Sequence, residues 1–329
     1  MSSDFALVTG ANSGLGAATA EALACKGIHV LLACRRGEDS TATANALANP
    51  RISAVPFDCD LGDLKKVRAF VDKLEKKMGA NAQVSILVNN AGMNGTGVKP
   101  WKTPENVGFL TQTNFLGPFV LTRLMMSKNM LRGGENGTSK ARVVNVSSVT
   151  HRTHGNIRDV QAFFNPTREG HYPNTKLANA LFTLALNEKF GNSVTAVSAD
   201  PGGAMTGIWR RYGPLARFAI SLIFAPADDA ATSVVHAAVA DMSSAPKYAY
   251  VARGAFAWKL LCGEEPSANV PRWRRLTATG IAVFVDWPIR WISGKMLCSH
   301  ATLVPPTPQA RDLDLANAVW DEAERRAGL

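Results

Sequence analysis

The chain has 329 residues, of which 46% are hydrophobic and 19% are charged, so it can bury a large core and is not a disordered chain. Its net charge of +10 favours a phosphate-bearing cofactor, an anionic membrane surface or an acidic substrate as partner. Nucleic acid is disfavoured because no basic block is interleaved with aromatic residues, and the five cysteines lack metal-ligand spacing and fit a reducing compartment.

A glycine-rich turn begins at residue 10, which leaves no room for a signal or transit peptide before it. No stretch provides the roughly 18 uninterrupted apolar residues that a membrane-spanning helix needs. We therefore expect an intracellular protein, either cytoplasmic or peripherally associated with a membrane.

Apolar strands and amphipathic helices alternate along the first 200 residues. Strands are expected over 5–9, 28–33, 52–57, 84–88, 142–146 and 194–199. Helices are expected over 15–26, 39–47 and 64–78, the last with Asp60 or Asp63 as its N-cap. Strands buried on both faces and linked by helices predict a Rossmann-type, doubly wound α/β fold with a mainly seven-stranded parallel sheet. Residues 1–253 and 298–329 are expected to form this single domain.

The turn Thr9-Gly-Ala-Asn-Ser-Gly-Leu-Gly16 follows the first predicted strand and opens the first predicted helix. Gly10 permits a tight turn, Gly14 lets the backbone approach a pyrophosphate, and Gly16 lets the helix pack on the strand. The helix N-terminus then meets the phosphate charge. A dinucleotide site is favoured over a plain structural turn because of this strand–turn–helix context.

Two arginines, Arg35 and Arg36, stand at the end of the second predicted strand, where NAD-preferring proteins place a carboxylate for the ribose 2′-hydroxyl. A guanidinium suits a 2′-phosphate through charge-assisted, forked hydrogen bonds. NADP(H) is therefore favoured over NAD(H), and a solvated surface pair is the alternative.

Tyr172 and Lys176 lie one helical turn apart, so their side chains project from one helix face. A nearby ammonium favours the phenolate, so we expect Lys176 to lower the pKa of Tyr172 from about 10 and make it an acid/base usable near neutral pH. Pro173 is tolerated in a first helical turn, which predicts a helix that begins near residue 172.

These motifs, together with Asn89-Asn-Ala-Gly92, Asn114, Ser147-Ser148 and Pro201-Gly-x-x-x-Thr206, occur in the order seen in the short-chain dehydrogenases/reductases, which the chain resembles. The resemblance spans residues 4 to about 250 and resumes near Pro305. The segments Ala33-Cys-Arg35 and Asn114-Phe-Leu-Gly-Pro-Phe are similar to the retinol-dehydrogenase-like branch. Light-dependent protochlorophyllide reductases share much of this pattern and are a neighbouring alternative.

The resemblance implies a role for each matching residue. Tyr172 would exchange the proton on the substrate oxygen. Lys176 would lower the pKa of Tyr172 and bind the nicotinamide ribose. Ser148, with Ser147 as the fallback, would hold the carbonyl oxygen. Asn114 would position a proton-relay water, unless it is only a kink or capping residue. The expected cofactor-binding residues are Gly10, Asn12, Ser13, Gly14, Leu15, Gly16, Arg35, Arg36, Asp60, Leu61, Asn90, Ala91, Gly92, Tyr172, Lys176, Pro201, Gly202 and Thr206.

The implied function is an NADP(H)-dependent oxidoreductase that transfers hydride between nicotinamide and the carbonyl or alcohol of a bulky apolar substrate of retinoid, steroid or lipid type. A non-catalytic NADP-binding sensor or scaffold is a second alternative, which the intact set Asn114, Ser148, Tyr172 and Lys176 disfavours.

The segment between Ser148 and Tyr172 is longer than in many family members and carries His151, His154 and His171. No cysteine or carboxylate joins these histidines at ligand spacing, so we expect loop packing and no metal site.

The chain also departs from the family's pattern by an apparent insertion, residues 254–297. This insertion carries four of the seven tryptophans and the basic segment Arg272-Trp-Arg-Arg275. It is interpreted as a lid over an apolar pocket or as a segment lying on an anionic membrane surface. Additional core packing or a contact in a homo-oligomer is the other interpretation.

Overall fold

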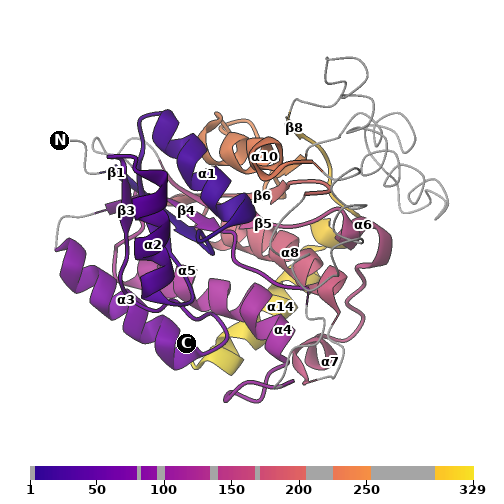
Figure 1. Ribbon diagram of the computed structural model, residues 1–329. Coiled ribbons are helices and arrows are strands. Elements are labelled where there is room, and N and C mark those ends of the chain that lie inside the picture. The colour runs from indigo at the N-terminus through magenta and orange to yellow at the C-terminus, as the bar shows by residue number, and fades with distance from the viewer. Residues whose placement is uncertain are drawn as a thin grey trace, which may run out of the picture.

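A computed structural model of the protein describes residues 4–79, 83–94, 101–133, 140–166, 171–204, 225–252 and 301–329. One eight-stranded sheet runs through them in the order β3-β2-β1-β4-β5-β6-β7-β8 (Figure 1). The strands are β1 (Asp4–Thr9), β2 (His29–Ala33), β3 (Ile52–Ala54), β4 (Gln83–Asn89), β5 (Ala141–Val146), β6 (Val194–Asp200), β7 (Tyr250–Ala252) and β8 (Thr302–Leu303). All pairings from β3 to β7 are parallel, which confirms the doubly wound α/β prediction.

The eighth strand was not predicted. β8 pairs antiparallel with β7, and Ala252 lies opposite Thr302. Two residues are too few to show an alternating pattern in the sequence. The predicted strand over 52–57 is also shorter than expected, because β3 ends at Ala54. The insertion predicted over 254–297 lies outside the described residues.

Helices cover both faces of the sheet, and strand side chains alternate between the two resulting cores. On β1, Leu7 belongs to one core cluster, whereas Ala6 and Val8 belong to the other. One face carries α1 (Gly14–Cys25), α2 (Gly37–Leu47) and α10 (Ala227–Val239). The opposite face carries α3 (Leu64–Met78), α5 (Gly117–Ser127), α8 (Tyr172–Phe190) and α14 (Leu313–Ala327) (Figure 1).

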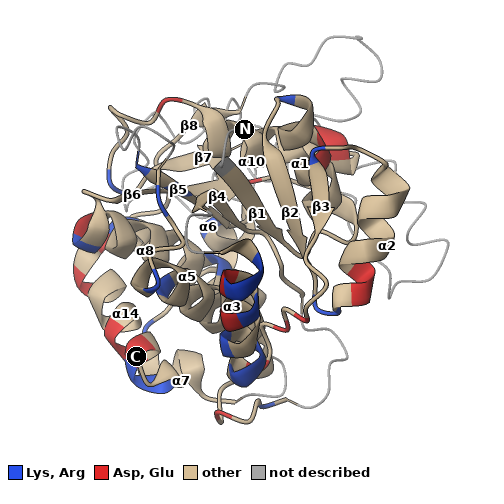
Figure 2. Cartoon of the chain, turned by 90° about the vertical axis from the view of Figure 1, so that its left-hand side faces the viewer, with Lys and Arg blue, Asp and Glu red and all other residues tan. Residues whose placement is uncertain are grey.

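Helix α3 shows how its sequence fixes both its ends and its orientation. Asp63 caps its N-terminus by accepting hydrogen bonds from the backbone N–H groups of Lys65 and Lys66, which confirms one of the two predicted caps. Its buried residues recur at helical spacing and face the core. Its lysines are exposed, and Figure 2 shows α3 as a helix rich in charged residues. The buried residues are Leu64, Val67, Phe70, Val71 and Leu74.

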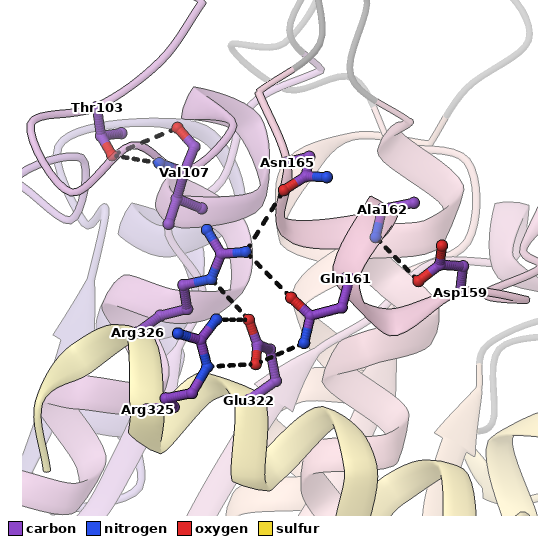
Figure 3. A network of polar contacts seen from close by, with 9 residues as sticks. All are labelled: Thr103, Val107, Asp159, Gln161, Ala162, Asn165, Glu322, Arg325 and Arg326. Atoms are coloured by element: carbon purple, nitrogen blue, oxygen red, sulfur yellow. Dashed lines mark hydrogen bonds and ion pairs between the residues drawn. The ribbon is translucent and has the colours of Figure 1, made fainter.

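The C-terminal helix α14 completes the core on the α8 side. Its Trp320 is 3% exposed and packs edge-on against Phe119 at 4.9 Å between ring centroids, with Phe182 at 5.8 Å. The same helix is tied to the short helix α7 (Val160–Phe164) through Glu322, whose carboxylate accepts hydrogen bonds from Gln161, Arg325 and Arg326 (Figure 3). Helix α14 thereby holds α7, which belongs to the segment between Ser148 and Tyr172.

Three short elements near the strand ends were not predicted. They are α6 (Thr150–His154), α7, and the π-helical turn Gln112–Leu116, which continues the short helix α4 (Phe109–Thr111). Each is too short to show a helical repeat of apolar residues. The predicted start of α8 at residue 172 is confirmed, with Pro173 in its first turn. Among the described helices, none has the length and apolarity required to traverse a bilayer.

Candidate active site

The order of strands reverses beside β1, because the chain passes from β1 to β2 and β3 and then returns to β4 on the other side of β1. Ligands of doubly wound sheets bind outside the carboxyl ends of the strands at such a reversal. The glycine turn follows β1 there, and the segment after β4 carries Asn90, Ala91 and Gly92.

The glycine turn has the shape that a pyrophosphate requires. Gly10 has a φ of +64°, and a Cβ there would lie 2.8 Å from the Cα of Ala91. A Cβ on Gly16 would overlap the carbonyl oxygen of Gly10. Helix α1 begins at Gly14, and the Ser13 side chain makes no capping hydrogen bond. The backbone N–H groups of the first turn are therefore available to bind an anion such as a phosphate group. These residues fit a dinucleotide.

Thr9 joins the first and fourth strands behind this turn, and the sequence had not singled it out. Its hydroxyl oxygen accepts hydrogen bonds from the backbone N–H of Asn90 at 3.0 Å and of Ala91 at 3.1 Å. The Asn90 amide in turn donates to the Thr9 carbonyl at 2.8 Å. Thr9 precedes the turn in the motif, which is the signal that could have marked it.

After β2, the two arginines that were expected to contact the adenosine part of the cofactor differ. Arg36 forms ion pairs with Asp39 at 2.7 Å and Glu38 at 3.2 Å, and these carboxylates raise its pKa. Arg35 is exposed beside it. Of the expected adenine contacts, Leu61 is buried, whereas Asp60 accepts a hydrogen bond from Gly62 N–H and lies 3.8 Å from Lys66.

Asn114 lies in the π-helical turn and is fully buried. Its Oδ1 accepts from the Met93 N–H at 2.8 Å, and its Nδ2 donates to the Met93 carbonyl at 2.8 Å and to the Thr175 hydroxyl at 3.1 Å. A Cβ on Gly92 would lie 3.3 Å from Asn114 Oδ1 and 3.4 Å from Lys176 Nζ. The structure therefore brings Asn114 and Lys176 to the same side of Gly92.

Lys176 is buried in α8 and donates from Nζ to the carbonyl oxygen of Val146, the last residue of β5, at 2.9 Å. Burial lowers the pKa of its ammonium to about 8, although the charge of Asp200 opposes this. Ser147, the fallback for the serine role, donates its hydroxyl to the Lys176 carbonyl at 2.8 Å and supports the helix. Ser148 is consequently the serine that faces the site.

Tyr172 is half-buried, and Ser148 hydrogen-bonds to it. The Nζ of Lys176 lies 5.5 Å from the centre of the Tyr172 ring. Contrary to our expectation, the pKa of the phenol is raised, because desolvation outweighs the hydrogen bond with Ser148 and the charge of Asp200 acts in the same upward direction. The phenol is therefore protonated at neutral pH.

Beyond β6, Pro201 is buried and Gly202 has a φ of +69°, and the Gly202 N–H donates to the Asp200 carboxylate at 2.9 Å. Thr206 lies outside the described residues. Of the three loop histidines, His151 is buried, and its Nδ1 lies 2.6 Å from the carbonyl oxygen of Ser148. Burial and the charge of Arg152 lower its pKa to about 3, so it is neutral. No cluster of metal-ligand side chains occurs in the described part of the chain.

Comparison with known proteins places this geometry in context. Residues 4–214 match the profile of a protein family described as short chain dehydrogenase. Retinol dehydrogenase 13 of Mus musculus is 29% identical over 330 residues, covering 98% of this chain and 83% of that protein. Human retinol dehydrogenase 12 is 33% identical over 230 residues (65% of this chain, 68% of that protein), and human polyprenol dehydrogenase is 32% identical over 244 residues (71% and 72%).

Two solved structures share the architecture. An uncharacterized protein from Mycobacterium Paratuberculosis superposes with a TM-score of 0.64 at 25% identity, covering 98% of this chain and 93% of that one. The RhlG/NADP complex of Pseudomonas aeruginosa superposes with a TM-score of 0.57 at 24% identity, covering 76% and 94%, and is evidence for the fold.

Proposed function

The chain belongs to the short-chain dehydrogenase family and is an oxidoreductase of alcohol and carbonyl groups, and from that premise we propose that it uses NADP(H) and acts on a bulky apolar substrate. The observation that carries the catalytic part is the meeting of four side chains at the ends of β4 and β5 and the start of α8. They are Asn114, Ser148, Tyr172 and Lys176.

A bound nicotinamide supplies or accepts the hydride. During reduction, negative charge grows on the carbonyl oxygen of the substrate, and Ser148 and Tyr172 provide the hydroxyl groups that stabilise it. Tyr172 then transfers its phenolic proton to that oxygen, and the Lys176 ammonium favours the phenolate that remains. A phenol with a raised pKa is protonated at neutral pH, which is the form that reduction needs. Oxidation of an alcohol uses the same groups in the opposite order.

The choice of NADP(H) is supported by Arg35, an exposed guanidinium at the end of β2, and by the lack of a carboxylate as the last residue of that strand. The apolar substrate is supported by the relatives, which are named for retinol and for polyprenol. It is also supported by the apolar segment after Ser148, where Phe163 and Phe164 pack against Phe115, next to Asn114.

The test is the decay of NADPH absorbance with carbonyl compounds that share one reacting group and differ in size, for example a long-chain and a short-chain aldehyde, repeated with NADH. We expect the highest kcat/KM for the large apolar aldehyde with NADPH. A preference for small polar carbonyls would contradict the substrate class, and equal use of NADH would contradict the cofactor. Binding of NADPH without turnover of any carbonyl would select a sensor or scaffold instead.

A further inference from the structure

A buried carboxylate lies beside the reacting groups without being one of them. Asp200 is the last residue of β6 and is 2% exposed. Its neighbour Ala199 accepts a backbone hydrogen bond from Ser147 at 2.8 Å, so the ends of β5 and β6 meet next to Ser148. Burying a carboxylate costs free energy unless hydrogen bonds or charges compensate it. The neighbours of Asp200 should therefore show what compensates the cost of burying this carboxylate and what role it has.

Three donors hold the Asp200 carboxylate in one orientation, one of them the backbone N–H of Val149. The hydroxyl of Tyr250, on β7, donates at 3.0 Å, and the backbone N–H of Gly202 donates at 2.9 Å. Tyr250 is 1% exposed, and burial together with the charge of Asp200 raises its pKa well above the ordinary value. Its hydroxyl is therefore protonated at neutral pH and can donate to the carboxylate.

The charged and titratable groups around this carboxylate come from two further elements, α6 and α8. Arg152 of α6 lies with its guanidinium 5.0 Å from the Tyr250 ring, and its charge lowers the pKa of Asp200, against the larger upward effect of burial. His151, on the same helix, is neutral and lies 3.4 Å from the Tyr250 hydroxyl. From α8, Lys176 donates from Nζ to the carbonyl oxygen of Val146 at 2.9 Å, and Val146 pairs with Ala199, the neighbour of Asp200, in the β5–β6 register. At this position the charge of Asp200 raises the pKa of Lys176, against the larger lowering by burial, and it adds to the upward shift in the pKa of Tyr172.

We propose that Asp200, anchored by Tyr250, is a positioning residue that holds a negative charge behind Tyr172 and Lys176 and so keeps both of them protonated. This inference rests on the acid–base role proposed above for these two residues. A negative charge favours an ammonium over a neutral amine and a phenol over a phenolate, so its effect on both groups has the same sign. The consequence is a pair poised to give a proton, which is what carbonyl reduction requires.

A purely structural role for Asp200 makes a different prediction. If the carboxylate only fixes the bend at Gly202, an amide in its place would keep an oxygen for the Gly202 N–H and would leave the titration of Lys176 unchanged. The substitution Asp200→Asn separates these roles because it removes the charge and preserves the shape. Tyr250→Phe provides a second, milder variant that keeps the charge and removes one hydrogen bond to it.

The experiment is a pH titration of the whole protein labelled with ¹³C at lysine Cε, followed by NMR. Lys176, identified by its loss in Lys176→Met, titrates below the surface lysines in the wild type. We expect its midpoint to fall by on the order of one pH unit in Asp200→Asn and by less in Tyr250→Phe. Tyr248→Phe is the matched control and should leave the midpoint unchanged, because Tyr248 packs beside Arg311, away from the site.

An unchanged Lys176 midpoint in Asp200→Asn would overturn the proposal. If that variant does not fold, Asp200→Ser removes the same charge and keeps an oxygen for the Gly202 N–H, and an unchanged midpoint there would overturn the proposal as well. The pH profile of kcat for reduction provides the second measurement: its alkaline limb should move to lower pH in Asp200→Asn, in step with the NMR midpoint. The NMR titration needs no turnover, so a wild type without NADPH-dependent activity would reject the proposed function and still leave the role of Asp200 to be decided by its own measurement.

Discussion

Asn114 and Met93 exchange two hydrogen bonds of 2.8 Å, in which the side-chain amide pairs with the backbone of Met93 as a neighbouring strand would. The third polar contact of this amide is with Thr175, three residues after Tyr172. One side chain thereby ties the loop after β4 to the start of α8. It fixes the distance between the segment at Gly92 and the start of α8, a role beyond the proton relay that the resemblance implied.

Replacing Tyr172 by Phe removes the proposed proton donor and leaves the ring in place. We expect kcat to fall by at least about a hundredfold, which is within the usual contribution of general acid catalysis. The dissociation constant for NADPH, measured by fluorescence titration, should change little, because the hydroxyl adds few cofactor contacts. A variant that retains more than about a tenth of the wild-type kcat would remove Tyr172 from this role.

The two arginines after β2 should contribute unequally to cofactor choice. Arg35→Ala is expected to raise the KM for NADPH by about tenfold or more, the magnitude of a lost charge-assisted hydrogen bond, with little effect on the KM for NADH. Arg36→Ala should have a smaller effect, because Asp39 and Glu38 already engage that guanidinium. Steady-state kinetics with both cofactors provides the comparison, and equal changes for NADPH and NADH would mean that these arginines are surface charge.

The buried ammonium of Lys176 should make stability depend on pH. Its folded-state pKa of about 8 lies below the ordinary 10.5, so below pH 8 the protein bears the full cost of burying the charge. As pH rises from about 8 to 10.5, the folded state releases the proton first, and the free energy of unfolding should increase by up to about 3 kcal/mol.

Lys176→Met has no proton to release, and Asn179 still donates to the Val146 carbonyl at 2.9 Å. Urea unfolding should therefore show that the free energy of unfolding of the variant exceeds that of the wild type most below pH 8. This difference should shrink as pH rises. The control is Lys189→Met, an exposed position on the same helix. A difference that does not vary with pH would show that the ammonium is not desolvated as described.

Much of this architecture could be predicted from the sequence, because local patterns encode it. The cap at Asp63, the helix start at Tyr172 and the turn at Gly10 all depend on residues within a few positions of each other. The strand order follows from parallel strands joined by helices. Spacing alone joined Tyr172 and Lys176, and the resemblance to the short-chain dehydrogenases/reductases added Ser148 and Asn114 to the same expected site.

The remaining features depend on pairs that are distant in sequence. Nothing near Asp200 indicates that its carboxylate meets Tyr250, 50 residues later. Glu322 and Gln161 are likewise separated by 161 residues. The raised pKa of Tyr172 was mispredicted because the ammonium was visible in the sequence, whereas the desolvation that outweighs it arises only from the folded surroundings.

The carboxylate of Glu322 should stabilise the attachment of α14 to α7. Arg326 donates to it at 2.6 Å, Arg325 at 2.8 Å and Gln161 at 2.9 Å (Figure 3). Because Arg325 is 62% exposed and solvent screens its charge, Glu322→Gln is expected to lower the free energy of unfolding by only about 1–2 kcal/mol at neutral pH. Asp321→Asn, at the exposed neighbouring position, is the control.

This contribution has a defined pH dependence. The hydrogen bonds from Arg325 are the largest cause that lowers the pKa of Glu322, from 4.5 to about 2. The stabilisation is present above 4.5 and is lost as pH falls toward 2, so the difference between the wild type and Glu322→Gln should shrink at acid pH. Urea unfolding at neutral pH and near pH 3 would measure it, and a difference that grows in acid would contradict the assignment.

Residues 254–297 can be removed behind a short linker, because Ala252 and Thr302 lie opposite each other in the β7–β8 pair. If the segment covers an apolar pocket, the shortened protein should fold and bind NADPH but lose activity on large apolar carbonyls while retaining it on small ones. Thermal unfolding, NADPH fluorescence titration and kinetics on one large and one small carbonyl test this. Loss of the folded state or of NADPH binding would indicate core or oligomer packing.

The position of α14 has a consequence for how the protein is made. Phe119 and Phe182, from the middle of the chain, are covered by Trp320, which lies in its last helix. A ribosome makes residues 313–327 after every other described element, so the nascent chain carries an open aromatic surface until α14 has emerged. Stalled or truncated products that lack α14 would keep that surface exposed, which makes them substrates for chaperones.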